Sequence, residues 1–284
     1  MEFSHIEMGI CTDVGKARQT NEDAGLILPE LGFCAVADGM GGADAGEVAS
    51  AWVINHVLKR IKGKRDACPE ERCLAIKEAV LEADRNIFEF SQAQGFTDGS
   101  GTTIVALLFN SWYATEAMVL HVGDSRAYRW RNGILKQLGK DHTIAAQTGI
   151  DEKKLPRPYR GVLTKAVGTG KKDCPERTPV DVAVDDLFIL CSDGLTKVVS
   201  DKKIAQLLGK NKELPVGEMA QLLVNEALAG GGPDNVTVAA IRIKQLPPDI
   251  TPTEAEREAN AGLQKAWTEM PAKDPSEEDT EVPE

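Results

Sequence analysis

The 284-residue chain is poor in the residues that many metal and redox sites use. It has only four histidines and six cysteines, and no two cysteines show the CxxC spacing. A histidine-rich zinc site or a cysteine-ligated cluster is therefore not expected. Cys34 and Cys191 lie within apolar runs, so we expect buried free thiols in a reducing cytoplasm.

Long apolar runs and basic clusters are also missing. The run Ile104–Phe109 has six residues, far short of a membrane span. The N-terminal MEFSHIEMG has neither the basic nor the apolar part of a signal peptide. The formal net charge of -11 argues against a nucleic-acid binder held by phosphate contacts.

The negative charge is concentrated near the C-terminus. Residues 245–284 hold eleven Asp and Glu against three Lys and Arg, a net charge of -8, which leaves 11 - 8 = 3 negative charges on residues 1–244. Prolines and acidic residues dominate this end, whereas the rest is rich enough in apolar residues for one large core. We expect a domain over residues 1–246 and an acidic, disordered tail over 247–284, within which Thr253–Trp267 has the pattern of a short docking helix.

The periodicity of the first 246 residues predicts an α+β fold. Apolar residues at helical spacing and short apolar runs alternate irregularly, not as a regular βαβ series. A capping box at Asp44 and Glu47 starts the first helix, and Asn132-Gly133 indicates a hairpin. Residues 141–160 are polar and irregular, which favours a surface flap. Helices are predicted at Ala45–Ile61, Pro69–Gln94, Asp201–Leu208 and Pro215–Ala229, and strands at Glu7–Asp13, Ala24–Leu28, Phe33–Ala37, Ser100–Phe109, Ala117–Val122, Arg126–Arg131, Val180–Val184, Leu187–Cys191 and Val236–Ile243.

Three aspartates stand beside glycines at the ends of predicted strands. Asp38 ends the apolar part of LGFCAVADGMGG, Asp193 follows LFILCS, and Asp234 precedes the last strand in GGGPDNVTVAAIRI. A single aspartate of this kind is usually a turn residue. Three at equivalent strand ends predict carboxylates that converge on a hard cation. Gly39 would let the backbone approach the ion with a carbonyl oxygen.

Other charged candidates lie in two loops. In KARQTNED, Arg18 has a planar fork suited to phosphate oxygens, and Glu22 and Asp23 can hold metal-bound waters beside Asp38. The alternative is that these are ordinary solvated loop charges. Asp124 stands in a tight turn, where an aspartate is usually structural, but it too lies at a strand end.

The ordered series of motifs closely resembles the PPM, or PP2C-type, metal-dependent protein serine/threonine phosphatases, and most of all their compact bacterial members. The resemblance covers about Met1–Lys244. In chain order the motifs are Arg18 with Glu22 and Asp23, ADGMGG (37–42), GTT (101–103), HVGDSRAY (121–128), DHT (141–143), LTKAVG (163–168), CSDGL (191–195) and GGPDNVTV (231–238).

The resemblance implies a sandwich of two antiparallel β-sheets flanked by pairs of α-helices. It also implies a site for two Mn2+ or Mg2+ ions. Asp38 would bridge both ions and the Gly39 carbonyl would bind one, while Asp193 and Asp234 would complete the other. Asp124, together with Asp193, would hold a weaker third ion.

The remaining roles follow from the same resemblance. Glu22 and Asp23 would act mainly through waters, Asn235 would orient its neighbour, and Arg18 would bind the phosphate. The implied activity is hydrolysis of phosphoserine and phosphothreonine by a hydroxide that bridges the two ions, without a covalent intermediate. Accordingly, no cysteine is followed six positions later by arginine, the spacing of cysteine-based phosphatases. The implied partners are phosphoproteins and a cognate Ser/Thr kinase, and we expect a monomer.

Two positions depart from the wider family pattern. Met40 stands where animal members place a histidine proposed as general acid, and Lys165 replaces a frequent arginine. Two other classes of function remain open: a catalytically silent phosphopeptide-binding module and an acidic regulatory protein that binds Ca2+ structurally. Loss of a metal ligand would favour the first, whereas all the matching carboxylates are present. The second would explain the aspartates but not Arg18.

Overall fold

The chain folds into two antiparallel sheets that pack face to face. The computed structural model describes residue 3 and residues 5–41, 45–95 and 100–269. The strands are β1 (Ile6–Asp13), β2 (Asp23–Leu28), β3 (Phe33–Met40), β4 (Gly101–Thr102), β5 (Ile104–Phe109), β6 (Glu116–Val122), β7 (Arg126–Arg131), β8 (Ile134–Leu138), β9 (Glu176–Asp181), β10 (Leu187–Cys191) and β11 (Val236–Ile243). One sheet has the order β1-β11-β10-β7-β8 and the other β2-β3-β5-β6-β9, with β4 paired to β3.

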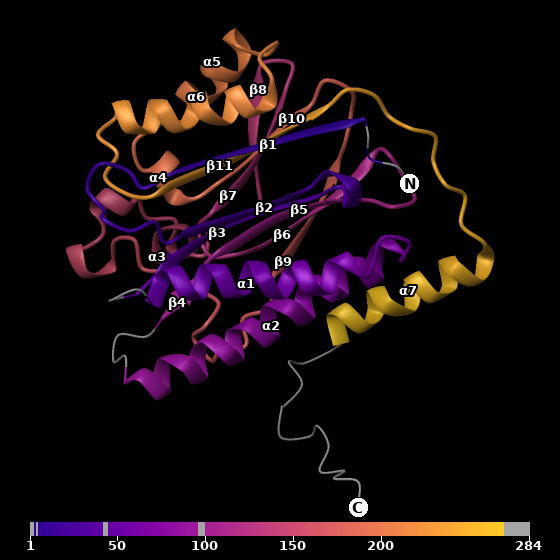
Figure 1. Cartoon of the computed structure of the whole chain (residues 1–284), viewed down its shortest axis with the longest axis horizontal. Coiled ribbons are helices and arrows are strands. Elements are labelled where there is room, and N and C mark those ends of the chain that lie inside the picture. The colour runs from indigo at the N-terminus through magenta and orange to yellow at the C-terminus, as the bar shows by residue number, and fades with distance from the viewer. Residues whose placement is uncertain (1–2, 4, 42–44, 96–99, 270–284) are drawn as a thin grey trace, which may run out of the picture.

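Helices cover the outer face of each sheet, as Figure 1 shows. The long pair α1 and α2 packs on the second sheet, and α5 and α6 pack on the first. The predicted sandwich flanked by helix pairs is confirmed. The helices are α1 (Ala45–Lys62), α2 (Pro69–Gln94), α3 (Ile144–Thr148), α4 (Asp193–Thr196), α5 (Asp201–Lys210), α6 (Val216–Ala229) and α7 (Glu254–Glu269), with 3-10 turns η1 (Pro29–Leu31), η2 (Glu152–Lys154) and η3 (Arg157–Tyr159).

Strand β3 shows why its sequence is apolar at successive positions. Neighbouring side chains of a strand point to opposite faces of the sheet. Phe33 and Ala35 pack against α1 and α2, whereas Cys34 and Val36 pack between the two sheets. Both faces of the strand are buried, so both sets must be apolar. Asp38, near the end of β3, is the first charged residue along the strand.

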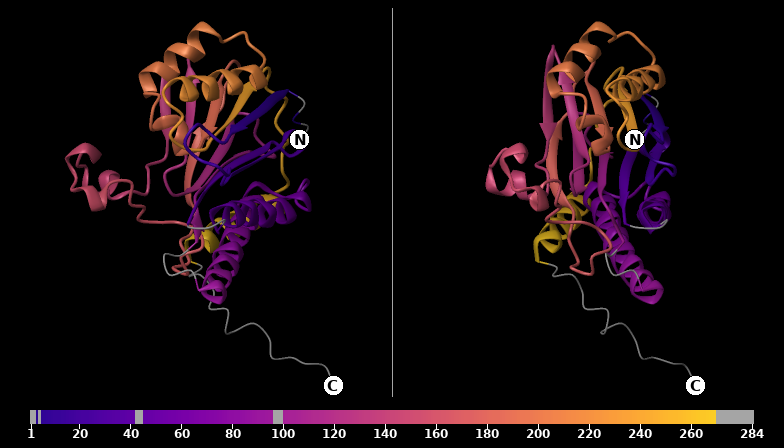
Figure 2. Two further views of the ribbon diagram at one scale, coloured as in Figure 1. Left: turned by 60° about the vertical axis from the view of Figure 1, so that its left-hand side comes forward. Right: turned by 90° about the vertical axis from the view of Figure 1, so that its left-hand side faces the viewer.

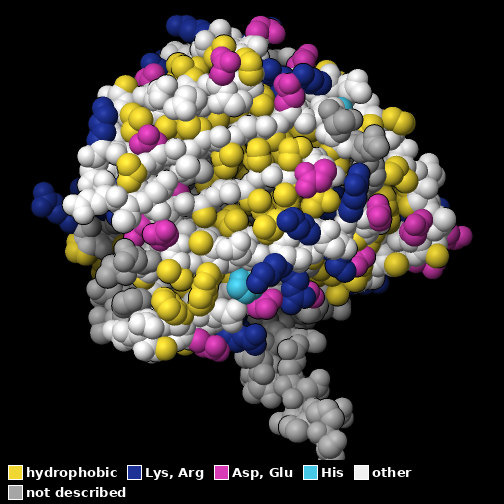
Figure 3. All heavy atoms as spheres, in the orientation of Figure 1, with side chains coloured by type: hydrophobic (Ala, Val, Ile, Leu, Met, Phe, Trp, Pro, Cys, Tyr) yellow, Lys and Arg dark blue, Asp and Glu magenta, His cyan; other side chains and the backbone are white. Residues whose placement is uncertain are grey.

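The space-filling view separates an apolar from a charged part of one face. Hydrophobic side chains show across the middle of Figure 3, where β1 and β2 run in Figure 1. Charged side chains gather along α1 and α2, where Arg60 pairs with Glu78 and Glu82. Among the described residues, we find no helix with the length and apolarity that crossing a membrane requires.

The flap lies between β8 and β9 and stands away from the sandwich in Figure 2. Its short elements are α3, η2 and η3. Its base is fixed by two main-chain bonds: His142 N donates to Gly123 O (2.9 Å), and Thr164 N donates to His142 O (2.8 Å). The base of the flap is therefore adjacent to the turn that carries Asp124.

Most predicted elements match the structure, although the bounds of some strands differ. The hairpin at Asn132-Gly133 joins β7 to β8 with positive φ at both residues, as its sequence predicts. The strand predicted at Val180–Val184 instead ends at Asp181, because the chain turns at Asp185, where φ is 68°. Asp44, the predicted helix cap, lies outside the described residues.

The C-terminal segment differs more from expectation. Helix α7 lies along α2 (Figures 1 and 2). Asn260 Oδ1 accepts a bond from Glu70 N, and the ring of Trp267 lies under the guanidinium of Arg177, 4.6 Å from the ring centre. The expectation of disorder throughout residues 247–284 is thus wrong for α7, which matches the predicted docking helix. The expectation of disorder came from the average composition of this segment, which gives little weight to Trp267, the one aromatic residue that anchors α7.

Candidate metal centre

The three strand-end aspartates come together because of how the strands are ordered. Antiparallel β10 and β11 are neighbours, so the end of one and the start of the other share an edge, which places Asp193 near Asp234. In the second sheet, Asp38 is paired in register with Asp23 of β2. Asp124, on the turn between β6 and β7, is close enough to Asp38 to influence its ionisation. The predicted carboxylates therefore form one group, which we call the site cluster: Asp23, Asp38, Asp124, Asp193 and Asp234.

The backbone of Asp38 is held by two threonines. Its N–H donates to Thr103 Oγ1 (3.0 Å), and its carbonyl accepts from Thr103 N (2.9 Å) and from Thr102 Oγ1 (3.0 Å). Thr103 Oγ1 also lies 2.6 Å from Ser125 Oγ. The GTT motif therefore fixes Asp38 relative to the turn that carries Asp124.

Gly39 is required by close approach of three backbones. A Cβ at this position would lie 2.1 Å from Gly46 O and 2.5 Å from Glu22 O, so no side chain fits. Gly39 N donates to Glu22 O (3.0 Å). The end of β3, the first turn of α1 and the loop before β2 thus meet without intervening side chains.

Asn235 fixes the loop that carries Arg18 and Glu22. Its Nδ2 donates to the carbonyls of Val14 and Thr20, each at 2.9 Å, and its Oδ1 accepts from Glu22 N (2.9 Å). Asn235 N also donates to Oδ1 of Asp234. This asparagine is buried, so its amide is fully committed to positioning that loop.

Burial and mutual repulsion disfavour ionisation of several members of the site cluster. Burial, then the charges of Asp23, Asp193 and Asp124, hold the pKa of Asp38 well above its usual range. Burial, with Asp193 and Asp234 adding to it, raises the pKa of Asp23 to about 6, although Ser192 donates a bond to this carboxylate. Burial and Asp193 raise the pKa of Asp124 to about 7.

Such a cluster fits divalent cations. Within the described residues, Asp23 Oδ1 is buried and has no hydrogen-bond partner. An oxygen-only set of crowded carboxylates is what Mg2+ and Mn2+ prefer, and bound positive charge would relieve the repulsion that raises these pKa values.

Two basic side chains reach the cluster. Arg18 Nε lies 2.9 Å from Asp234 Oδ1 and its Nη1 3.6 Å from Glu22 Oε2, so the structure places this arginine against carboxylates. Lys197, four residues after Asp193, contacts both Asp193 and Asp234. The sequence analysis missed Lys197. Its spacing of four from a strand-end aspartate that starts a helical turn could have revealed it.

The two unusual positions have local explanations. Met40 lies against Gly101, with its Cε 2.7 Å from where a Cβ of that glycine would be. It supplies no proton donor. Lys165 Nζ pairs with Glu176 Oε1 at 2.7 Å, beside the flap base, and contacts none of the carboxylates of the site cluster through a described ion pair.

A histidine pair with an adjacent glutamate lies near the flap base. The buried rings of His121 and His142 stack with centres 4.5 Å apart and 14° between planes, and ligand atoms of both and of Glu176 lie within 4.8 Å of one another, close enough to hold an ion. In the structure, His121 Nε2 instead lies 2.9 Å from Lys140 O and His142 Nε2 3.0 Å from Glu176 Oε1, so both nitrogens face partners within the chain. His142 Nδ1 accepts from Gly123 N, which leaves the proton of the neutral ring on Nε2. We therefore assign this group to support of the flap.

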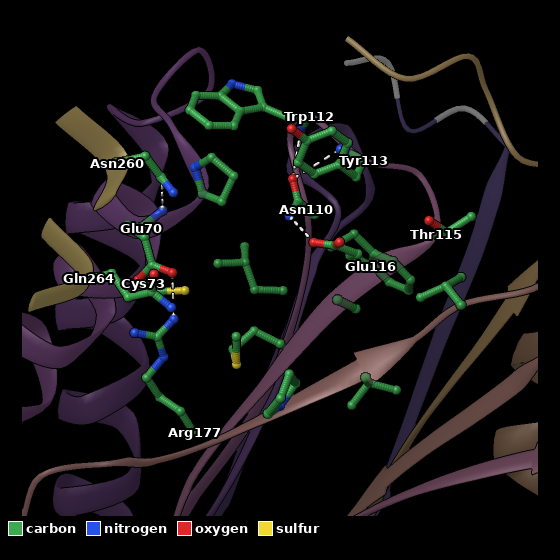
Figure 4. A pocket seen from close by; sticks show the side chains of 18 of the residues that line it. Glu70, Cys73, Asn110, Trp112, Tyr113, Thr115, Glu116, Arg177, Asn260 and Gln264 are labelled. Atoms are coloured by element: carbon green, nitrogen blue, oxygen red, sulfur yellow. Dashed lines mark hydrogen bonds and ion pairs between the residues drawn. The ribbon is translucent and has the colours of Figure 1, made fainter. Parts of the chain in front are cut away.

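A pocket of about 860 Å3 lies elsewhere, between α7, α2, β9 and the β5–β6 hairpin. In Figure 4, Glu70 and Asn260 face Trp112 and Tyr113 across it. Glu70 is paired with Arg177 (2.7 Å), and the described carboxylates that line the pocket do not gather into a group that could hold an ion. The clustered carboxylates are thus at the strand ends and not in this pocket.

Comparison with known proteins shows the family that the chain resembles. Residues 15–223 match the family model described as protein phosphatase 2C. The chain is 37% identical over 235 residues to the serine/threonine protein phosphatase PstP of Mycobacterium tuberculosis, an alignment that covers 80% of this chain but only 43% of that protein. It is 30% identical over 239 residues to the serine/threonine phosphatase stp of Listeria monocytogenes, covering 81% of this chain and 93% of that one.

Solved structures show the same fold. The catalytic domain of PstP in complex with two manganese ions superposes with a TM-score of 0.72 at 33% identity, covering 84% of this chain and 99% of that one. The serine/threonine phosphatase Stp1 from Staphylococcus aureus gives a TM-score of 0.76 at 29% identity, with 86% and 98% covered. The chain therefore belongs to the protein phosphatase 2C family.

Proposed function

We propose that this protein is a metal-dependent protein serine/threonine phosphatase. The observation that carries the proposal is the site cluster itself: carboxylates from distant parts of the chain lie together, and three of them, Asp23, Asp38 and Asp124, have raised pKa values. Among the described residues, the cations that contact the cluster are too few to balance it. The relatives named as serine/threonine phosphatases support it, and PstP has been crystallised with two manganese ions.

The residues would divide the work as follows. Asp38, the Gly39 carbonyl, Asp193 and Asp234 would hold two Mn2+ or Mg2+ ions, and Asp124 would contribute to a weaker third site. When bound, the ions polarise phosphoryl oxygens and activate water as the nucleophile. The threonines and Asn235 hold the ligands in place before substrate arrives, which lowers the reorganisation that the reaction requires.

Three loop residues complete the proposed site. Glu22 and Asp23 would accept hydrogen bonds from metal-bound waters, for which the unpartnered Asp23 Oδ1 is suited. Arg18, half-exposed at the rim, would orient the phosphate with its guanidinium. In the structure this group lies against Asp234, so binding phosphate requires it to turn or to share its donors.

The substrates would be proteins phosphorylated on serine or threonine by a partner kinase. The described cysteines are all free and three of them are buried, which suits a reducing, cytoplasmic setting. We further propose that residues 1–246 form the catalytic domain and residues 247–284 an appended acidic segment.

Phosphate release from a phosphothreonine peptide tests the proposal. The full chain, stripped with chelator, should be inactive and should regain turnover on addition of Mn2+. Asp38→Asn should remain inactive on addition of Mn2+. Asp66→Asn changes an exposed aspartate outside the site cluster and should behave as the unmodified protein does. Turnover that survives exhaustive chelation would contradict the metal requirement.

Phosphate release together with measurements of peptide binding and Ca2+ binding separates the other two functions. A silent phosphopeptide-binding module would bind the peptide without releasing phosphate. A structural calcium protein would bind Ca2+ and show neither peptide binding nor release. Retention of every matching carboxylate weighs against the first, and Arg18 at the rim weighs against the second.

A further inference from the structure

The ammonium of Lys197 lies between two aspartates of the site cluster. Its Nζ is 2.6 Å from Asp193 Oδ2 and 2.7 Å from Asp234 Oδ2. Lys197 follows the short helix α4, and its N–H bonds to the carbonyl of Asp193 (2.8 Å). The lysine is thus placed there by the same turn that places Asp193.

The oxygens of Asp234 are already engaged by donors. Oδ2 accepts from Lys197 Nζ, while Oδ1 accepts from Asn235 N (3.0 Å) and pairs with Arg18 Nε (2.9 Å). A divalent ion that uses Asp234 must therefore displace a donor or share an oxygen with it. Lys197 is well suited to leave, because its side chain is 45% exposed and flexible.

We propose that Lys197 is a counter-ion built into the metal site: it neutralises Asp193 and Asp234 in the metal-free chain and competes with the divalent ion for them. The inference rests on the proposed function, which assigns an ion to these aspartates. An ammonium and a divalent cation cannot share the same oxygens without strong repulsion at this range. Lys197 thereby stabilises the metal-free fold and weakens metal binding. The fraction of sites that hold an ion therefore depends on the concentration of free divalent ions.

The chain offers a matched control for this lysine. Lys203 on α5 is also 45% exposed and also forms an ion pair, with Glu226 at 3.0 Å, but it lies outside the site cluster. Lys197→Met and Lys203→Met therefore remove the same charge from equally exposed stems. Lys197→Gln removes the charge but keeps a hydrogen-bond donor, which separates the charge from the packing of the side chain.

The first measurement is Mn2+ binding by calorimetry to the full, chelator-stripped chain. Lys197→Met and Lys197→Gln should bind the more weakly held of the two ions about tenfold more tightly. The interaction between close charge pairs changes binding affinity by this factor or more. Lys203→Met should bind as the unmodified protein does. Equal or weaker Mn2+ affinity in both Lys197 variants overturns the proposal.

The second measurement is thermal unfolding in chelator, which does not depend on activity. Both Lys197 variants should melt a few degrees lower than the unmodified chain, roughly the shift that one lost favourable pair produces. Added Mn2+ should abolish this difference. Unchanged or higher melting of both variants without metal also overturns the proposal.

The two proposals fail in distinguishable ways. If the unmodified chain binds no Mn2+ and releases no phosphate, the proposed function is wrong, and this inference with it. If the unmodified chain binds Mn2+ and hydrolyses phosphopeptide while the Lys197 variants keep its affinity, only the role of Lys197 is wrong.

Discussion

Two groups of acidic residues in this protein face opposite electrostatic conditions. In the site cluster, aspartates lie close to one another, and burial and mutual repulsion raise the pKa values of Asp23, Asp38 and Asp124. In the second group, which we call the arginine cluster, Arg129 and Arg131 hold Asp181 and Asp186. Asp186 is fully buried, and Arg131 donates to both its oxygens at 2.6 Å. Bonds from Arg129 and Arg131 lower the pKa of Asp181 to about 2.

The difference shows how a structural acidic group differs from a functional one. Every charge of the arginine cluster is paired with an opposite charge within the chain, so no bound ion is needed to neutralise it. The site cluster contains five aspartates but has only Arg18 and Lys197 as described ion-pair partners from outside the acidic set. Bound cations would supply the missing charge, as the proposed function requires.

Asp38→Asn should give the largest difference between its effect on activity and its effect on stability. We expect phosphate release at saturating Mn2+ to fall more than about 10³-fold, because the carboxylate that balances both ions is lost. Stability in chelator should be unchanged or higher, since the variant removes one of several like charges. Phosphate-release assays and thermal unfolding measure the two effects. Near-normal turnover would remove Asp38 from the site.

Asp186→Asn should lower stability and leave turnover unchanged, the reverse of Asp38→Asn. Breaking a buried bidentate pair costs about 3 kcal/mol of unfolding free energy, because Arg131 loses its compensating charge. Turnover per folded molecule should be retained. Urea unfolding and the same activity assay test this. A variant as stable as the unmodified chain would show that the arginine cluster is not needed for the fold.

Arg18→Ala should affect substrate more than metal. We expect kcat/KM for a phosphopeptide to fall about tenfold or more, because the guanidinium fork no longer orients the phosphate. Mn2+ affinity, measured by calorimetry, should change less. Because Arg18 also pairs with Asp234, a large change in metal affinity with unchanged kinetics would assign it to the ions instead.

The two clusters should respond to pH in opposite directions. Asp23 and Asp124 bind protons more tightly in the folded chain, with pKa values of about 6 and 7 against an ordinary 3.8, so the metal-free protein should lose stability as pH rises from about 4 to 7. Asp181 has a lowered pKa of about 2, so its contribution is present above about pH 4 and is lost as pH falls towards 2.

Unfolding in chelator across this range tests the assignment. Asp23→Asn should flatten the loss of stability between pH 4 and 7, and Mn2+ should reduce it. An unchanged pH profile in Asp23→Asn would mean that this carboxylate does not titrate as its burial and neighbours indicate.

Deleting residues 271–284 should have the smallest effect. The described part of α7 already ends at Glu269, and the deleted stretch contains no predicted metal ligand. Hydrolysis of a small phosphate ester and the melting temperature should stay nearly unchanged. A salt-dependent change in KM on deletion would show instead that these acidic residues compete with substrate at the site.

The fold class predicted from the sequence is confirmed, and the candidate site residues were selected by the same kind of local pattern. Doubly buried strands such as Phe33–Ala37 are apolar throughout, and Asp38 stands out at the end of one. The disorder expected for residues 247–284 was partly wrong because Trp267, which anchors α7, contributes little to an average of composition. The pairing of Arg18 with Asp234 was not foreseen, since a phosphate-binding role says nothing about its position without phosphate.

The sequence by itself determined which residue types stand at the strand ends: aspartates beside glycines, where a strand leaves the sheet and its backbone can turn. Only the tertiary structure decided how their charges combine. Asp38 lies on β3 of one sheet, Asp193 follows β10 of the other, and Lys197 reaches Asp234 across 37 positions of sequence. Electrostatic energy depends on distance in space and on burial, neither of which is written in local sequence.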